Sequence, residues 1–455
     1  MISGISSKFS RMTTMLILVD ALLLFISAYL GILIRFSGVP GSSSESIYPK
    51  AISFVLVMGY VFYLADLYNY HKRHIVYRRI IYAFLIGLVP LSLLFYFIPE
   101  LSIGRGWFLI SYVLAFFLIL AWRWAAEPLL DKFRPHEKIL IVGTGSSALD
   151  AVDILKEEGQ YIYDIEGFIP ISGNQRLVSP EKILAEDIDL AEFAKNRDID
   201  KVIIAADDRR RSLPFSELLE CKMAGIDVLD VPAVTEALKS KISLNIYPSS
   251  LIFTSGFKRT MMIKTLKANI DKALAILALI ISSPLFLIIP ILIKLDSRGP
   301  VIFKQLRVGE YGKYFEIMKF RTMRKDAEAG GPSWTASGDS RITRVGGFLR
   351  KSRLDELPQL INVLKGDMSF VGPRPEVPHF VDKLKEAIPY YAQRHVVKPG
   401  ITGWAQIKYP YGASAEDAGE KLQYDLYYIK HFSIALDAFI VFETVRSVLT
   451  GRGSR

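Results

Sequence analysis

Four apolar segments near the start of the chain are each about as long as a helix that crosses a bilayer. They cover residues 14–34, 51–70, 80–98 and 107–126. Basic residues gather before the first segment, after the fourth and at 71–79, whereas the two other loops, residues 36–50 and 99–106, carry only Lys50 and Arg105 as basic residues. Because basic connections stay on the cytoplasmic side, the pattern predicts a four-helix transmembrane bundle over residues 1–134 with both ends in the cytoplasm.

Two acidic residues, Asp20 and Asp66, fall inside these apolar segments. An acid at membrane depth either belongs to an ion or proton path or is satisfied by a contact inside the bundle. No series of acids and bases continues from either residue. We therefore expect satisfied contacts and assign these two residues no functional role.

The composition limits the remaining classes of protein. Half of the 455 residues are hydrophobic (51%) and 22% are charged, which excludes a disordered or fibrous chain. The single cysteine, Cys221, excludes a disulfide framework and a cysteine-based zinc site. The net charge of +10 suits anionic headgroups, phosphorylated substrates or nucleic acid equally well.

A fifth apolar stretch, residues 273–293, has basic residues on both sides. Ser283 and Pro284 stand at its middle, where proline removes a backbone donor and bends a helix. A serine hydroxyl can bond the carbonyl that such a break frees. Since both flanks favour the same anionic face, we expect a re-entrant helix that enters and leaves on one side; a kinked simple span is the alternative.

Residues 135–250 have the pattern of a soluble α/β domain. Strands are predicted at 138–142, 164–169, 201–205 and 226–231, with a Gly-x-Gly-x-x-Ala turn at 143–148. That turn could hold a pyrophosphate at a helix N-terminus, with Asp164 or Glu166 on the ribose. However, the domain lacks a second mononucleotide half and a Tyr-x-x-x-Lys pair. We therefore favour a truncated Rossmann-like packing or regulatory module and expect no bound dinucleotide.

The C-terminal third is rich in basic residues, with fifteen Lys and Arg against ten Asp and Glu over residues 296–376. They come in groups, such as Lys319 with Arg321, and Arg350 with Arg353. Guanidinium groups bind two phosphate oxygens at once. No nucleic-acid-binding motif accompanies them, and the segment follows a membrane helix directly. This predicts a phosphate-bearing small molecule or lipid as substrate, and no nucleic acid.

An acid pair lies inside this basic region. Asp355 and Glu356 precede Pro358, and leucines and isoleucine at helical spacing follow until Gly366. The pair thus lies just before a helix N-terminus, where anions are stabilised. An aspartate there can attack phosphorus, and a neighbouring glutamate can hold Mg²⁺. The alternative is an acid pair that only stabilises the helix dipole.

Residues 352–376, SRLDELPQLINVLKGDMSFVGPRPE, resemble the signature of bacterial polyprenyl-phosphate phosphoglycosyltransferases of the monotopic type. The resemblance extends through residues 299–305, 319–323 and 398–406, and covers about residue 270 to the C-terminus. The apolar helices and truncated insert ahead of it resemble the long-form members that prime exopolysaccharide synthesis.

The resemblance implies transfer of a sugar 1-phosphate from a UDP-sugar to undecaprenyl phosphate, with release of UMP. It implies that Asp355 is the nucleophile, that Glu356 ligates Mg²⁺, and that Ser283 and Pro284 break the re-entrant helix. It also places a set of basic residues near the phosphates: Lys319, Arg321, Arg350, Arg353 and Arg374. One departure is Lys267-Ala268 before Asp271, where members often carry Lys-Arg.

Together these features predict a membrane α plus α/β protein. Its parts are a four-helix transmembrane bundle (1–134), a Rossmann-like domain (135–250), a linker with the re-entrant helix (251–295) and a small α/β catalytic domain (296–455). The expected location is the bacterial inner membrane, with the catalytic domain on its cytoplasmic face. The rivals are a glycosyltransferase that releases UDP, a membrane-tethered nucleotide sensor and a nucleotide-sugar epimerase or dehydratase. The missing Tyr-x-x-x-Lys pair argues against the last. The sugar, and whether the chain forms a homo-oligomer, are left open.

Overall fold

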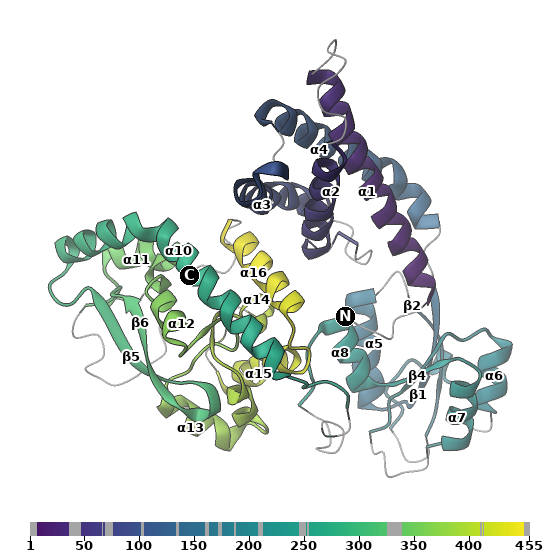
Figure 1. Ribbon diagram of the computed structural model, residues 1–455. Coiled ribbons are helices and arrows are strands. Elements are labelled where there is room, and N and C mark those ends of the chain that lie inside the picture. The colour runs from purple at the N-terminus through teal and green to yellow at the C-terminus, as the bar shows by residue number, and fades with distance from the viewer. Residues whose placement is uncertain are drawn as a thin grey trace. The chain divides into compact units, whose positions relative to one another are not determined.

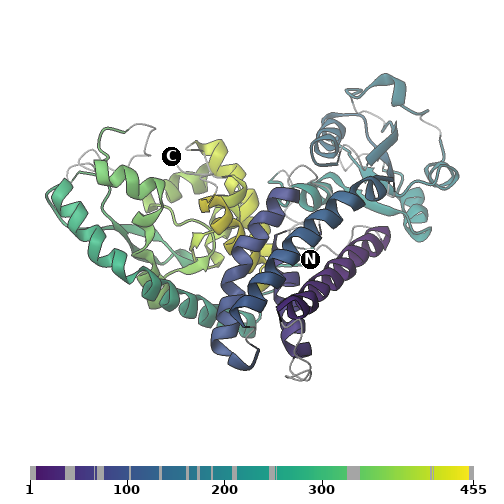
Figure 2. The same ribbon diagram turned by 90° about the horizontal axis from the view of Figure 1, so that it is seen from above.

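The computed structural model divides the chain into two compact units, Met1–Lys239 and Ser240–Arg455. Figures 1 and 2 show both units from two directions. The residues it describes are 7–35, 47–65, 67–68, 76–101, 104–132, 136–159, 163–171, 175–185, 188–207, 213–244, 252, 254–324, 339–409, 412 and 414–449.

The first unit begins with the expected apolar helices. They are α1 (Ser7–Arg35), α2 (Ile47–Leu64), α3 (Val76–Phe97) and α4 (Arg105–Lys132). Helix α1 packs against α4 and α2, and α2 packs against α3. Each is long and apolar enough to cross a membrane. The N-terminal region therefore has the character of a membrane protein, as the hydropathy pattern predicts.

The acid inside α1 has a partner in α4. Asp20 is fully buried and forms an ion pair with Arg123, which confirms the satisfied contact expected for this residue. The indole Nε1 of Trp107 also joins these helices by donating to the Ala28 carbonyl, at 2.8 Å. Asp66 and the basic residues 71–74 lie outside the described residues.

A four-stranded parallel sheet follows, with strand order β2-β1-β3-β4. The four strands lie within a residue of their predicted ranges, and the elements in order are β1 (Glu137–Val142), α5 (Ser146–Gly159), β2 (Tyr163–Ile169), α6 (Leu190–Asn196), β3 (Lys201–Ile204), α7 (Phe215–Met223), β4 (Asp227–Asp230) and α8 (Val231–Lys239). Alternate residues of β1 point to opposite faces. Ile139 and Ile141 pack under α5 and α8, whereas Leu140 and Val142 pack under α6 and α7. This domain is α/β, with helices on both faces of the sheet.

The second unit contains the long helix α10 (Met261–Asp296) and a compact α/β region. That region comprises the hairpin β5 (Ile302–Val308) and β6 (Tyr314–Phe320), α11 (Arg344–Lys351), the 3₁₀ turn η6 (Leu354–Glu356), α12 (Gln359–Lys365), β7 (Ser369–Val371), α13 (Pro378–Ala387), the 3₁₀ helix η7 (Tyr391–Val396), β8 (Gly400–Thr402), α14 (Trp404–Lys408), α15 (Ala415–Lys430) and α16 (Ile434–Leu449). Strands β5 and β6 are antiparallel, and β7 and β8 are parallel.

Helix α10 carries the predicted proline break. Pro284 cannot donate to the carbonyl of Ile280, four residues earlier. The hydroxyl of Ser283 donates to that carbonyl instead, at 2.8 Å, and Ser282 donates to the Ala278 carbonyl at 2.6 Å. The serines therefore compensate for the missing backbone donor, as expected, and Figure 1 shows the two halves of α10 running in different directions.

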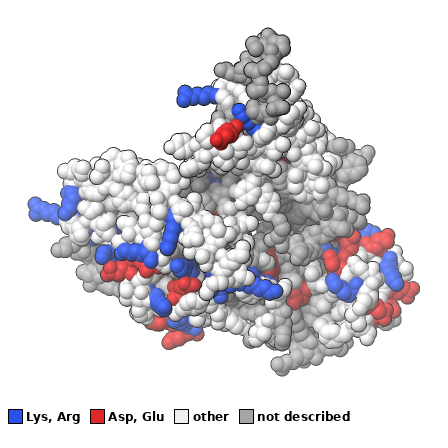
Figure 3. Space-filling model, viewed as in Figure 1, with Lys and Arg blue, Asp and Glu red and all other residues white. Residues whose placement is uncertain are grey.

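One face of α10 packs on the elements that surround the acid pair. Ala275 meets Ile317 of β6 and Leu360 of α12. Beyond the break, Ile289 and Ile293 pack on Phe320 and Leu349. The other face is apolar and exposed, with Ile281, Leu287 and Leu295 each at least 72% exposed. Figure 3 shows this surface almost without charge and bordered by Lys and Arg side chains. Such a face is suited to lipid, so α10 carries an apolar surface beside the acid pair.

Candidate active site

The acid pair lies in a tight turn between two helices. Arg353 adopts a left-handed backbone conformation (φ 59°), and the chain then forms η6, which holds Asp355 and Glu356. Helix α12 begins at Gln359 and ends at Gly366, whose φ of 87° suits glycine. Both carboxyl groups are buried, at 8% and 7% exposed. The sequence correctly predicted a helix start directly after this pair.

Strand β6 is fixed beside α12 by a buried asparagine. The Asn362 side chain accepts from the Met318 amide at 3.1 Å and donates to the Glu316 carbonyl at 2.7 Å. These bonds set the register of β6 relative to α12. As a result, the next residue of the strand, Lys319, reaches the acid pair.

Glu356 is held by two cations at one oxygen. Lys319 Nζ lies 2.9 Å from Glu356 Oε1, and Arg374 Nη2 lies 2.8 Å from the same atom. Arg374 comes from the loop after β7, and its Nη1 also donates to Gln406 Oε1 at 2.8 Å. Three segments far apart in the sequence therefore meet at this carboxylate.

The two neighbouring carboxyl groups differ in electrostatics. Burial raises the pKa of Asp355; Lys319 opposes this without overcoming it, and the Glu356 charge raises the pKa further. Burial would also raise the pKa of Glu356, but Lys319 and Arg374 outweigh it, so that pKa lies below its usual value. Burial in turn lowers the pKa of Lys319. Glu356 is thus held in its charged form, whereas the charged form of Asp355 is less stabilised, so the two carboxyl groups differ in basicity.

The remaining predicted basic residues lie at different places around the turn. Arg350 donates to Thr322 Oγ1 at 2.9 Å, and its charge acts on Asp355. The charge of Arg353 acts on Glu356. Arg321 instead donates to the backbone and hydroxyl oxygens of Ser297, at 2.8 and 2.9 Å, and so holds the C-terminal end of α10. Its Nε and Nη1 atoms, both buried, have no partner among the described residues.

The acid pair has donors that suit a magnesium ion. Mg²⁺ in phosphoryl-transfer sites is held by one or two carboxylates together with substrate phosphate oxygens and water. Asp355 and Glu356 supply adjacent carboxylates, and Glu356 stays ionised because two cations lie beside it. Among the described residues, no three His, Cys, Asp or Glu side chains form a metal-binding group. The donor set therefore fits an ion that arrives with phosphate, rather than a closed protein cage.

Sequence reasoning missed three polar residues near the site, two of them buried (Asn362 and Arg394) and one half-buried (Gln406). Asn362 sets the register of β6, and Gln406 supports Arg374. Arg394 donates to the Arg374 carbonyl at 3.1 Å. Gln406 lies within the segment whose resemblance was noted, but neither spacing nor charge distinguishes these residues from ordinary polar positions.

The turn before α5, which was considered as a pyrophosphate site and not favoured, is closed by the chain itself. Asp207, which follows β3, accepts from the Ser147 amide at 2.8 Å and from the Ser146 amide and hydroxyl at 3.2 and 3.0 Å. These hydrogen bonds outweigh partial burial and lower the pKa of Asp207. A Cβ on Gly145 would lie 1.8 Å from Asp207 Oδ2. A carboxylate thus occupies the place where a phosphate would bind.

Comparison with known proteins identifies the family of this chain. Residues 262–451, which include all of its partners described above, match the family model described as bacterial sugar transferase. The chain is 32% identical over 361 residues to the UDP-glucose:undecaprenyl-phosphate glucose-1-phosphate transferase of Xanthomonas campestris pv. campestris, covering 76% of this chain and 75% of that protein. The chain therefore belongs to the bacterial sugar transferase family.

Two further relatives match over shorter stretches. The UDP-N-acetylgalactosamine-undecaprenyl-phosphate N-acetylgalactosaminephosphotransferase of Aeromonas hydrophila is 44% identical over 238 residues, 52% of this chain and 56% of that protein. The exopolysaccharide production protein PSS of Rhizobium leguminosarum bv. phaseoli is 43% identical over 198 residues, 41% of this chain and 98% of that protein. The chain thus spans little more than half of the Aeromonas relative but nearly all of the Rhizobium protein.

Proposed function

We propose that this chain is a phosphoglycosyltransferase that moves a sugar 1-phosphate from a UDP-sugar to undecaprenyl phosphate and releases UMP, as the priming step of exopolysaccharide or capsule synthesis. The observation that carries the proposal is the pair of adjacent buried carboxyl groups with opposite pKa shifts in a basic pocket. The names of the relatives, which act on UDP-glucose or UDP-N-acetylgalactosamine and undecaprenyl phosphate, support the two substrates.

In the proposed reaction, a carboxylate oxygen of Asp355 attacks the phosphorus that bears the sugar. The bond between that phosphorus and the bridging oxygen breaks, and UMP leaves with the electron pair. An oxygen of undecaprenyl phosphate then attacks the same phosphorus, which releases the Asp355 carboxylate and forms the diphosphate-linked sugar lipid. A covalent intermediate lets two bulky anionic substrates use one pocket in turn.

The basic residues would stabilise the negative charge that moves between phosphate oxygens during these two steps. Arg374 is 41% exposed at its side chain and lies between Glu356 and solvent, so it can meet the incoming diphosphate. Lys319 lies on the other side of Glu356 Oε1. Glu356, with Asp355, would hold Mg²⁺ together with substrate phosphate oxygens. When bound, that ion neutralises charge on the phosphate oxygens. Arg321, Arg350 and Arg353 complete the proposed phosphate-binding set.

The product distinguishes this proposal from its nearest rival. Purified protein incubated with undecaprenyl phosphate and a panel of UDP-sugars should release UMP with at least one of them. Release of UDP instead would identify a glycosyltransferase that moves only the sugar. Binding of a nucleotide without any turnover would favour a membrane-tethered sensor, and the Asp207 contact at the start of α5 argues against that function.

We also propose that the chain lies in the bacterial inner membrane, with four spans in the first unit, a re-entrant α10 and a cytoplasmic site. Lysines lie at both ends of α10, which favours the cytoplasmic side for both ends. A site at the membrane surface also lets the anionic substrates bind without moving a charge into hydrocarbon. Tags placed before Lys258 and after Leu295 should both be cytoplasmic. Opposite locations of the two tags would identify α10 as a span and contradict the re-entrant form.

A further inference from the structure

The loop that carries Arg374 has an unusually complete set of backbone contacts. Four consecutive carbonyls each accept a hydrogen bond of 3.0–3.1 Å: Pro373 from the Gly400 amide, Arg374 from Arg394 Nη2, Pro375 from Arg307 Nη1, and Glu376 from the Val308 amide. Prolines on both sides of Arg374 also restrict its neighbours. This backbone segment, residues 373–376, is therefore held at every residue.

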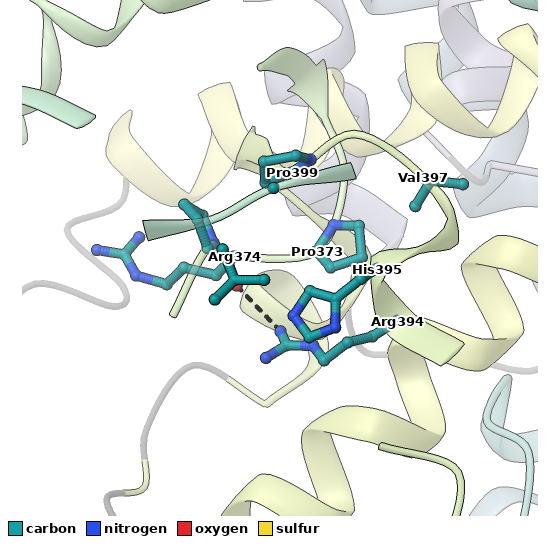
Figure 4. Close-up of a pocket in the computed structure, with 9 residues that line it drawn as sticks. Pro373, Arg374, Arg394, His395, Val397 and Pro399 are labelled. Carbon is teal, nitrogen blue, oxygen red and sulfur yellow. Dashed lines mark hydrogen bonds between the residues drawn. The ribbon is translucent and has the colours of Figure 1, made fainter. Parts of the chain in front are cut away.

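Arg394 is the more deeply buried of the two side chains that donate to this segment. Its side chain is 6% exposed and points from η7 into the unit, where its Nη2 meets the Arg374 carbonyl (Figure 4). Asp425 of α15, 2% exposed at its side chain, lies 2.8 Å from Arg394 Nη2 and accepts from Nε at 3.0 Å. The hydroxyl of Tyr391 accepts from Nη1 at 2.8 Å. Burying this charge costs free energy unless it is paired, so its position is strongly defined.

The backbone carbonyl and the guanidinium group of Arg374 connect the buried Arg394–Asp425 pair to the acid pair. The Arg374 carbonyl accepts from Arg394, and the Arg374 guanidinium donates to Glu356 and Gln406. A shift of the loop backbone therefore moves the guanidinium away from Glu356. Because a displacement of about 1 Å near a reacting group can cost on the order of 10²-fold in rate, the placement of this loop matters for turnover.

We propose that Arg394, with Asp425 as its counter-ion, is a positioning residue that holds Arg374 in place for phosphate transfer. Its contact with the loop follows from the geometry alone, and its effect on turnover rests on the proposed function. Of the residues assigned above to the acid pair or to substrate, Arg394 contacts Arg374, and it does so at the backbone carbonyl, so we expect it to act through Arg374.

A double-mutant cycle tests whether Arg394 acts on turnover through Arg374. Arg394→Gln should lower the rate of UMP release on the order of 10-fold to 10²-fold in the full-length protein. In an Arg374→Ala background, the same substitution should change the rate by less than about twofold, because the group it positions is already gone. Asp425→Asn should behave like Arg394→Gln and serves in its place if that variant does not fold. Equal fold losses in both backgrounds would overturn the proposal.

Asp437→Asn is the matched control. Asp437 is also a buried carboxylate of the second unit, lies 2.7 Å from Lys267 and accepts from the Tyr428 hydroxyl at 2.8 Å. Removing its charge should lower the melting temperature about as much as Asp425→Asn while leaving the rate within about threefold of wild type. If both variants slow turnover alike, the effect of Asp425 is general instability and the positioning role is wrong.

Hydrogen–deuterium exchange separates this inference from the proposed function. Exchange of the peptide that carries the Gly400 amide, which donates to the Pro373 carbonyl, should become faster in Arg394→Gln and stay unchanged in Asp437→Asn. This readout needs no substrate, so it holds even if wild-type protein releases no UMP from any UDP-sugar. Unchanged exchange of this peptide in Arg394→Gln would overturn the positioning role directly.

Discussion

The starts of helices α5 and α12 both have sequence features that can hold a phosphate, yet their surroundings in the structure differ. At α5 the amides of Ser146 and Ser147 are bonded by Asp207 of the same domain. At α12 the acid pair does not cap the helix in this way: Lys319 and Arg374 converge on Glu356. One helix start is closed by an internal anion, and the other is surrounded by cations from distant segments.

The difference shows that a helix N-terminus alone does not identify a phosphate site. Glycine-rich turns and helix dipoles attract any anion, including a carboxylate of the same chain. What distinguishes α12 is an excess of positive charge that its two buried carboxylates only partly neutralise. We therefore place phosphate chemistry at α12 and assign the α5 domain a packing or regulatory role. The following substitutions test that division.

The largest effect is expected from Asp355→Asn, which keeps the size of the side chain but removes the anionic oxygen. Turnover should fall on the order of 10⁴-fold or more, as when a covalent nucleophile is lost. UMP release with undecaprenyl phosphate present measures this rate. Asp207→Asn is the matched control at the other helix start and should retain the wild-type rate. Near wild-type turnover by Asp355→Asn would mean that the lipid phosphate attacks directly.

Glu356→Gln should have the next largest effect. It removes the charge that Lys319 and Arg374 stabilise and that a magnesium ion would require. A loss on the order of 10³-fold corresponds to about 4 kcal/mol of transition-state stabilisation. The Mg²⁺ concentration for half-maximal rate should also rise. A variant with an unchanged magnesium requirement would show that Glu356 is not a ligand.

Lys319→Met should change the pH dependence as well as the rate. Attack requires ionised Asp355, so the rate falls as the pH drops through the raised pKa of this group. Lys319 is the largest influence that lowers this pKa, and its loss should raise the pKa further. The acidic limb of the pH–rate profile should therefore move to higher pH. A limb that stays in place would show that another group controls it.

Asp207→Ala should have the smallest effect on turnover. Losing the hydrogen bonds at the start of α5 should lower the free energy of unfolding by about 1 kcal/mol. Gly145→Ala should be destabilising too, because its Cβ would collide with Asp207. Thermal denaturation and UMP release measure the two quantities. A dinucleotide that copurifies with wild type and is lost in Gly145→Ala would reverse our assignment for this domain.

Much of this architecture was predictable because local rules determine it. Hydropathy located the apolar helices, alternating apolar runs located the four parallel strands, and Pro358 with Gly366 marked the ends of the helix after the acid pair. The serine compensation at Pro284 also follows from local backbone chemistry. These features depend on residues a few positions apart.

The convergence of side chains was not predictable in the same way. Asp207 lies 61 residues after Ser146, and Arg394 lies 20 residues after the carbonyl it holds. Arg321 shares a strand end with Lys319 but bonds Ser297 instead of the acid pair. The clusters of basic residues in the sequence indicated phosphate chemistry in this region. Which cation meets which carboxylate depends on strand register and loop packing, which no spacing rule supplies.

The mass of the intact protein tests the central claim most directly. Wild type incubated with its UDP-sugar and Mg²⁺, without any lipid acceptor, should gain the mass of one sugar phosphate and release one equivalent of UMP. Peptide mapping should place the added mass on Asp355, and undecaprenyl phosphate should remove it. If UMP appears only when both substrates are present and no adduct forms, the covalent role of Asp355 is wrong.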